Sequence, residues 1–185
     1  MPMLDPLIPK AISIGLGLMF LVAAYHKLSD GAQFRVTLLE YQLLPDAMVA
    51  STSKIIPLIE ILLGGSWLLS YYGQGLTAIA SVALLGAYAF AIGINLHRGR
   101  VHFDCGCGFA GKRDNEQYLS GGLILRNLAL IAAALLTLLP VGARELGSGD
   151  YLTLMAALLA TALLFGAVNQ LLANRTAINT WRKFK

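Results

Sequence analysis

Charged residues and cysteines are both scarce in this sequence. Only 13% of its 185 residues are charged, whereas a soluble globular domain has roughly 25%. The basic residues give a net charge of +4, but they are not clustered with aromatic residues that could stack on bases, so we expect no nucleic-acid partner. The shortage of charge indicates a membrane protein, and the two cysteines fall together in one short segment.

Hydrophobic residues make up 57% of the chain and occur in blocks separated by short polar connections. Each block approaches the roughly 20 residues that a helix needs to cross about 30 Å of hydrocarbon. A soluble helical core is disfavoured, because stretches such as LTAIASVALLGAYAFAIGI (residues 76–94) have no polar face with helical period. We therefore expect an all-α integral membrane protein, a single membrane domain over residues 1–185 with a bundle of about five transmembrane helices. Their expected ranges are 7–26, 55–72, 75–96, 119–141 and 151–173.

The first connection contains an amphipathic stretch, FRVTLLEYQLLPDAMV (residues 34–49). Its apolar residues fall mostly on one side of a helix: Phe34, Leu38, Leu39, Leu43 and Leu44. The stretch is too short and too polar to span a bilayer, so it predicts an interfacial helix that lies over the mouth of the bundle. An ordinary connecting loop is the alternative.

Small residues recur inside the expected spans. They are Gly15, Gly17, Gly64, Gly65, Ser66, Gly86 and Gly93. Residues of this size allow membrane helices to approach closely, so we interpret them as packing positions.

Basic residues are distributed unequally between the two sides that the spans define. With five spans, the first and third connections share one side with the C-terminal segment, and eleven basic residues fall there. They are Lys27, Arg35, Lys54, Arg98, Arg100, Lys112, Arg113, Arg175, Arg182, Lys183 and Lys185. The other side, which includes the N-terminus, has Lys10 and Arg144. The positive-inside rule then places the N-terminus outside the membrane and the other side in the cytoplasm, where the tail WRKFK would contact anionic lipid.

Both cysteines, Cys105 and Cys107, lie in the stretch RVHFDCGCGFAGK (residues 100–112), separated by one glycine. A disulfide between them would close a small ring with distorted geometry, and Gly106 is of the residue type that tolerates such backbone angles. A strained disulfide is more oxidising, whereas a structural one would stabilise little because the closed loop is so short. We interpret the pair as one that opens and closes, within a redox loop over residues 97–118.

Ionisable residues are concentrated around the pair. The cationic or potentially cationic ones, which would favour the attacking thiolate, are His97, Arg100, His102, Lys112 and Arg113. Cys105 is the better candidate for the attacking thiol, because it is next to Asp104, a candidate proton acceptor, and close to His102. Two alternatives stay open. One is a metal site of the two thiols with His102 and His97, although zinc sites prefer longer ligand spacings; the other is two thiols without a role.

Two ionisable residues, Glu60 and Arg126, fall well inside the expected spans, away from their ends, where charge is costly and usually functional. Both would lie about 8 to 11 Å from the side that carries the cysteines, so they can pair. Such a pair would fix the helix register. Alternatively, Arg126 and its neighbour Asn127 would steady a thiolate, a mixed disulfide or the oxygen of a bound quinone.

Several short elements together resemble the MauE branch of the DoxX-like redox-associated membrane proteins. They are HKLSD (26–30), the Leu43–Leu44–Pro45 turn, IPLIE (56–60), FDCGCG (103–108) and LRN (125–127). The resemblance covers roughly residues 10–140. In this chain Gly108 stands between the second cysteine and Phe109, where the family motif has phenylalanine directly.

The resemblance implies a core of four helices plus one C-terminal helix, with an outline shared by vitamin K epoxide reductase and DsbB-type enzymes, which relay electrons to a quinone. It also implies a part in maturing methylamine dehydrogenase, whose small subunit carries many disulfides, alongside a periplasmic thioredoxin-like protein of the MauD type. The candidate catalytic residues, taken from the residues themselves, are Cys105 and Cys107, tuned by His102, Asp104, Arg126 and Glu60. A quinone is the one cofactor considered, and no resident metal is expected.

These implications conflict with the charge distribution, which places the cysteines inside whereas periplasmic clients need them outside. Either the pair carries electrons across the bilayer by facing the two sides in turn, or the charge rule fails for this chain. The first hypothesis is a membrane thiol-disulfide oxidoreductase or electron conduit. The alternative is a non-enzymatic scaffold that holds a thioredoxin-like partner or a dehydrogenase subunit at the bilayer through the interfacial helix. A transporter is disfavoured because the sequence has no internal repeat.

Overall fold

A computed structural model of the chain describes residues 4–69, 74–99 and 121–183. The described residues form helices joined by short connections and one isolated bridge between Leu4 and Val141. The six helices are α1 (Leu7–Ser29), α2 (Gly31–Tyr41), α3 (Asp46–Leu69), α4 (Gln74–His97), α5 (Gly121–Leu136) and α6 (Ser148–Lys183). The expectation of an all-α protein is thereby confirmed.

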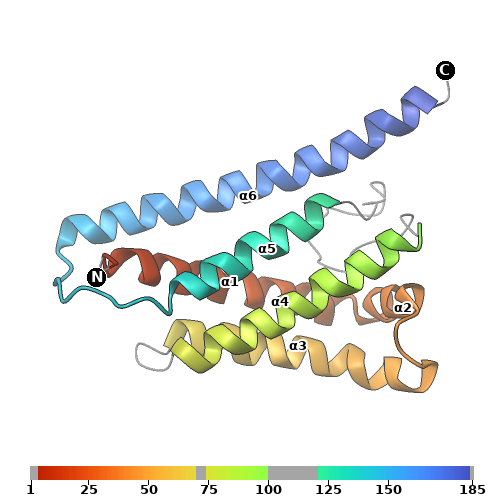
Figure 1. Cartoon of the computed structure of the whole chain (residues 1–185), viewed down its shortest axis with the longest axis horizontal. Helices are drawn as coiled ribbons and strands as arrows, with labels where there is room; N and C mark the ends of the chain where they lie inside the picture. Colours follow the sequence, from red (N-terminus) through yellow and green to blue (C-terminus); the bar gives the residue numbers. More distant parts are fainter. Residues whose placement is uncertain (1–3, 70–73, 100–120, 184–185) are drawn as a thin grey trace.

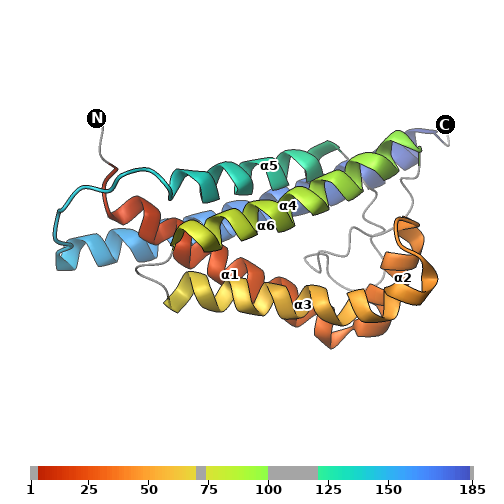
Figure 2. The same ribbon diagram turned by 60° about the horizontal axis from the view of Figure 1, so that its bottom comes forward.

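The long helices form two closely packed pairs. Helix α1 packs against α3, α4 packs against α5, and α6 lies against α1. The two pairs lie side by side and the chain alternates in direction, so the N-terminus and the C-terminus are at opposite ends (Figures 1 and 2). We call the end that carries α2, the last residues of α4 and the first residues of α5 the loop end. The opposite end, where α1 begins and α6 begins, is the N-terminal end.

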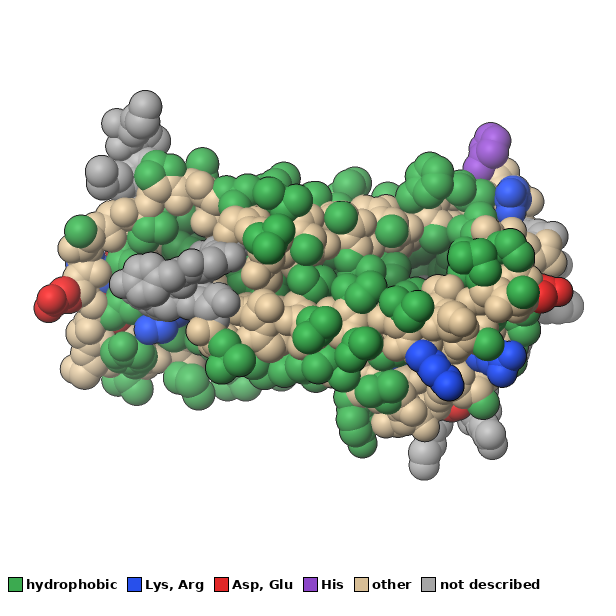
Figure 3. Space-filling view, turned by 90° about the horizontal axis from the view of Figure 1, so that it is seen from below, with side chains coloured by type: hydrophobic (Ala, Val, Ile, Leu, Met, Phe, Trp, Pro, Cys, Tyr) green, Lys and Arg blue, Asp and Glu red, His purple; other side chains and the backbone are tan. Residues whose placement is uncertain are grey.

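Four of the helices are long and apolar enough to cross a membrane. They are α1, α3, α4 from Gly75 to His97, and α6 from Ser148 to Val168. Hydrophobic side chains cover most of the length of one face, whereas charged side chains lie toward its two ends (Figure 3). The chain is a multi-pass helical integral membrane protein.

The fourth expected span, 119–141, is shorter than predicted. Its helix, α5, has 16 residues and is about 24 Å long, less than the roughly 30 Å of a hydrocarbon core. The helix tightens before Pro140, because the amide of Leu139 bonds to the carbonyl of Leu136 three residues back. A residue before proline is driven away from helical backbone angles, which explains why the helix ends before residue 141.

The interfacial helix also differs from the prediction, since residues 34–49 are divided between α2 and the start of α3. Asp30 caps α2 by accepting a hydrogen bond from the amide of Gln33 (3.2 Å). The helix ends at Tyr41, because the next residue, Gln42, has a left-handed φ of 47°, and Pro45 precedes the next helix. The buried face of α2 consists of Phe34, Thr37 and Tyr41, whereas Leu39 and Leu43 of the expected apolar face are exposed.

Two of the expected packing glycines lie where α1 crosses α3. A Cβ at Gly17 would be 2.8 Å from the side chain of Leu68 and 3.2 Å from the carbonyl oxygen of Gly64. A Cβ at Gly64 would be 2.8 Å from the side chain of Leu21 and 3.0 Å from the carbonyl oxygen of Gly17. The absence of a side chain at both positions therefore sets the close approach of α1 and α3. Gly15, Gly65 and Gly86 face open space instead.

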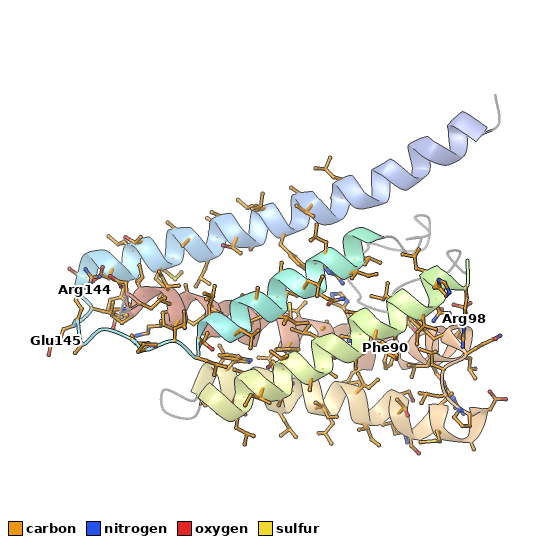
Figure 4. The ribbon with its side chains drawn as sticks, viewed as in Figure 1. Phe90, Arg98, Arg144 and Glu145 are labelled. Carbon is orange, nitrogen blue, oxygen red and sulfur yellow. The ribbon has the colours of Figure 1, made fainter. Side chains whose placement is uncertain are left out.

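The N-terminal end is held by exposed polar contacts. Arg144 donates to Asp150 (2.7 Å) and lies 3.5 Å from Asp5, while Lys10 lies over the ring of Tyr151 at 5.0 Å. Arg144 and its neighbour Glu145 lie at this end, and Arg98 lies at the loop end (Figure 4). These contacts join the start of α1 to the start of α6.

Candidate functional site

A buried ion pair joins α1 to α3. Lys27 Nζ lies 2.5 Å from Glu60 Oε1, and the side chains are only 5% and 1% exposed. Ionisable groups in the membrane interior are costly and are usually retained for function. This pair is therefore the first candidate for a functional site among the described residues.

A tyrosine of the second helix pair completes the cluster. The hydroxyl of Tyr88, on α4, donates to the same Glu60 Oε1 at 2.8 Å. Lys27 Nζ lies 5.3 Å from the centre of the Tyr88 ring and 5.6 Å from that of Phe34, distances at which the aromatic faces attract a cation. Four helices, α1 to α4, thus contribute to one cluster of Lys27, Phe34, Glu60 and Tyr88.

The hydrogen bonding of the Glu60 carboxylate is asymmetric. Its Oε1 atom accepts from Lys27 and from Tyr88, whereas its buried Oε2 atom has no hydrogen-bond partner in the part of the chain that the structure describes. A buried polar atom without a partner costs about 1–3 kcal/mol. Such an atom in an otherwise satisfied cluster is an unusual feature that needs a physical explanation.

Lys27 is the functional candidate that the sequence reading assigned to a connection. Helix α1 continues to Ser29 rather than ending at residue 26, so Lys27 lies within it and is buried. The signal was present, since Lys27 follows the buried residues Leu16, Phe20 and Ala24 of α1 at helical spacing. Tyr88 was also missed, although a signal was present, since it follows the buried Leu85 of α4 at helical spacing.

Glu60 lies deeper in its helix than expected. The prediction placed it about five residues into a span that starts at residue 55, but α3 begins at Asp46, about 21 Å away along the helix. Pro57 lies inside α3, one turn before Glu60. It has no amide to donate to the carbonyl of Ser53, yet the helix continues through it.

The expected pairing of Glu60 with Arg126 is wrong, since the ion pair of Glu60 is made with Lys27. Arg126 is half-buried on α5, and its guanidinium carbon lies 5.8 Å from the centre of the Phe165 ring of α6. The difference arises from packing. Helix α5 packs on α4, whereas α3 packs on α1, so the nearest available cation for Glu60 comes from α1.

The expected redox residues lie outside the described part of the chain. Residues 100–120 contain Cys105, Cys107, His102 and Asp104. The disulfide between the two cysteines and the roles of His102 and Asp104 therefore stay predictions. The helices on either side are described, and α4 ends and α5 begins at the loop end (Figure 1). His97, at the start of the expected redox loop, is the last residue of α4 and is exposed. No cluster of candidate metal ligands occurs among the residues that the structure describes.

Comparison with known proteins identifies relatives over most of the chain. The profile of the family described as Methylamine utilisation protein MauE matches residues 5–140. The chain is 32% identical to the methylamine utilization protein MauE of Paracoccus denitrificans over 185 residues, which cover 95% of this chain and 96% of that protein. It is also 32% identical to MauE of Paracoccus versutus over 166 residues, which cover 89% and 82% of the two chains.

A third relative, MauE of Methylophilus methylotrophus, is 34% identical over 103 residues, which cover 56% of this chain and 54% of that protein. No solved structure gives a significant match. The match to the family covers residues 5–140, which include Lys27, Glu60 and Tyr88 as well as both cysteines. On these matches, the chain belongs to the MauE family of methylamine utilisation proteins.

Proposed function

We propose that the protein is a membrane thiol-disulfide redox protein that supports the maturation of a disulfide-containing client, with methylamine dehydrogenase as the expected client. The observation that carries the proposal is the Cys105-Gly106-Cys107 sequence, which contains both cysteines of the chain. Membership of a family of methylamine utilisation proteins supports the choice of pathway.

The proposed reaction is an exchange of two electrons and two protons between dithiol pairs. A thiolate of the partner attacks the Cys105–Cys107 disulfide, forms a mixed disulfide and releases one thiol of the pair. A second thiol of the partner then attacks the mixed disulfide and releases the other thiol. The partner leaves as a disulfide and the protein is left as a dithiol. The reverse sequence delivers electrons to an oxidised partner.

The fold brings the ends of the cysteine segment to one end of the bundle. Gly99 and Gly121, which flank it, follow α4 and begin α5 at the loop end. Cys105 follows Gly99 by six residues, and six residues span at most about 22 Å. The proposal therefore places the exchange at the loop end, where Arg98 is exposed and where positive charge would favour a thiolate.

The roles proposed for the tuning residues follow from this arrangement. His102 and Asp104, neighbours of Cys105 in the sequence, would hold or accept its proton. Arg126, in the second turn of α5, would stabilise the negative charge of a thiolate or a mixed disulfide. Glu60 is already neutralised by Lys27, so we assign it a positioning role through the helices it joins.

The proposed partner is a thioredoxin-like protein, which would meet the cysteine pair at the loop end. A non-enzymatic scaffold is the second candidate function, and one observation favours it. Helix α2 lies at the loop end (Figure 1), and the side chains of Arg35 and Glu40 are exposed on its surface. Such a surface could hold a partner at the bilayer without any thiol chemistry.

Serine substitution of the cysteines separates the two functions. In cells that depend on this protein for methylamine growth, Cys105→Ser and Cys107→Ser should each abolish maturation of the client while the protein is still made and inserted. Arg35→Glu and Glu40→Lys serve as the matched set. Full maturation in the double serine variant, together with its loss on charge reversal in α2, would favour the scaffold over the redox protein.

The side on which the cysteines work is tested by labelling. The excess of basic residues at the loop end leads us to propose a cytoplasmic loop end in a bacterial inner membrane. A membrane-impermeant thiol reagent added to intact cells, with and without prior reduction, should then leave Cys105 and Cys107 unmodified until the cells are lysed. Labelling of intact cells after reduction would place the pair outside and reverse the proposed orientation.

A further inference from the structure

Polar side chains of α3 and α4 face each other in layers seven residues apart. Trp67 Nε1 donates to Ser81 Oγ at 2.9 Å, and Tyr88 donates to Glu60 at 2.8 Å. Each step of seven residues is close to two helical turns, about 10.5 Å along the axis. The two contacts therefore define an antiparallel register in which layers recur every two turns.

The same register, continued by two turns toward the loop end, pairs Ser53 of α3 with Asn95 of α4. Neither side chain uses its hydrogen bond across this layer. The hydroxyl of Ser53 donates to the carbonyl of Ala50 (2.9 Å), and the Asn95 amide donates to the carbonyl of Ala91 (3.1 Å). Asn95 is completely buried, yet no described residue donates a hydrogen bond to its Oδ1 atom.

The two layers nearer the loop end thus differ from the Trp67–Ser81 layer in their hydrogen bonding. The Trp67–Ser81 layer is closed, because Ser81 accepts from Trp67 and donates to the carbonyl of Thr77 (2.8 Å). The two layers nearer the loop end each present one buried acceptor without a donor, Glu60 Oε2 and Asn95 Oδ1. Both atoms need a hydrogen-bond donor, and neither needs an acceptor.

Charge restricts the chemical class of that donor. Lys27 and Glu60 form a neutral pair, so a cation bound at Glu60 Oε2 would leave an uncompensated positive charge in the membrane interior, which is costly. The ligand is therefore neutral and carries at least one O–H or N–H group. Water fits this requirement, and buried waters typically bond to polar groups that lack protein partners.

We infer that the bundle binds a short row of water molecules between Asn95 and Glu60, entering from the loop end. Asn95 and Tyr88 are seven residues apart on α4, about 10.5 Å, which is longer than one water can bridge and suits two or three. The row ends at the closed Trp67–Ser81 layer. It hydrates the Lys27–Glu60 pair and gives protons and water a path from the loop end to the middle of the membrane. This inference does not depend on the proposed thiol chemistry.

Water-edited solid-state NMR of the isotope-labelled protein in lipid bilayers tests the inference. Magnetisation should pass from water to the side-chain carboxyl carbon of Glu60 and to the carboxamide carbon of Asn95 several-fold faster than to the side chain of Ser81. Ser81 is the matched control, because it is equally buried on the same stripe of α4 and its hydroxyl is fully bonded. Equally slow transfer to all three, as from a dry interior, would overturn the inference.

A variant locates the path. Asn95→Leu keeps a side chain of the same branching at this position but removes the outer acceptor and fills its space with methyl groups, so transfer from water to Glu60 should become several-fold slower while the helix content is unchanged. Asn127→Leu, at a buried asparagine of α5 whose amide donates to Leu123, is the matched control and should leave Glu60 hydrated. If transfer from water to Glu60 is as fast in both variants as in the wild type, water does not reach Glu60 past Asn95, and the proposed path is wrong. If Asn95→Leu does not fold, the wild-type comparison with Ser81 still decides the inference.

Discussion

The protein contains two regions in which a basic residue meets carboxylates, and they differ in exposure. At the N-terminal end, Arg144 pairs with Asp5 and Asp150, and the Arg144 side chain is 53% exposed. Inside the bundle, Lys27 pairs with Glu60 and both side chains are at most 5% exposed. Exposed pairs typically contribute about 0–1 kcal/mol, whereas breaking a buried pair costs about 3–5 kcal/mol. An ion pair between a basic residue and a carboxylate therefore contributes little to stability at the exposed N-terminal end, whereas the buried pair is required for stability.

The largest effect is expected from removing the buried cation. Lys27→Met leaves Glu60 buried without its counter-charge, so the free energy of unfolding in mixed micelles should fall by about 3–5 kcal/mol. The double variant Lys27→Met with Glu60→Leu should recover most of the loss, because neither charge remains. Lys54→Met, at an exposed position of α3, is the control. A loss no larger than that of the control would mean that the buried pair resembles the exposed one.

Tyr88→Phe removes one hydrogen bond from the buried carboxylate and keeps the ring near Lys27. A hydrogen bond to a charged group contributes about 1.5–3 kcal/mol, so unfolding in the same micelles should require that much less free energy. Tyr25→Phe is the matched control, because the Tyr25 side chain is 68% exposed. Equal effects of the two substitutions would contradict the contact between Tyr88 and Glu60.

The buried pair depends on how closely α1 and α3 approach, which Gly64→Ala tests. The added Cβ would lie 2.8 Å from the Leu21 side chain and 3.0 Å from the carbonyl oxygen of Gly17, and overpacking of this kind costs about 1–3 kcal/mol. Gly65→Ala, next in sequence, meets nothing within 4 Å and should be neutral or slightly stabilising. Thermal unfolding of the two variants in the same detergent distinguishes these outcomes.

The smallest effect is expected at the exposed ion pairs of Arg144. Arg144→Ala should lower the free energy of unfolding by about 0–1 kcal/mol. That effect should shrink further in concentrated salt, because the Debye length falls from about 10 Å at 0.1 M to about 3 Å at 1 M. The effect of Lys27→Met should hardly change with salt. A large, salt-independent loss for Arg144→Ala would show that the two regions do not differ as their exposure indicates.

The sequence allowed the membrane class and most of the helices to be predicted. Apolar length predicted α1, α3, α4 and α6, and their bounds differ from the expected ranges mainly at the start of α3 and at the C-terminal end of α6. Length alone did not predict the end of α5 before Pro140, nor the division of residues 34–49 at Gln42. Both depend on local backbone geometry, which a hydrophobicity pattern does not contain.

The candidate site was predicted in part. Glu60 was identified because a carboxylate inside an apolar run is rare, but its partner was assigned to Arg126 and is Lys27. Which cation reaches a buried carboxylate depends on which helices pack together, and this pairing is set by the glycines where α1 crosses α3. Such a choice is made between segments distant in sequence, so spacing within one segment could not reveal it.

Composition and local pattern alone determined that this chain enters a membrane as helices, that both cysteines fall in one short segment of the sequence, and that polar residues are concentrated toward one side of the membrane. These properties follow from the cost of exposing polar groups to hydrocarbon, because each spanning segment must satisfy its own backbone hydrogen bonds as a helix. The tertiary structure decided that Lys27, Glu60 and Tyr88 form one cluster and that Glu60 and Asn95 retain unpartnered oxygens. Those features arise only when α1, α3 and α4 pack in one register, because hydrogen bonds between helices require their side chains to meet within about 3 Å.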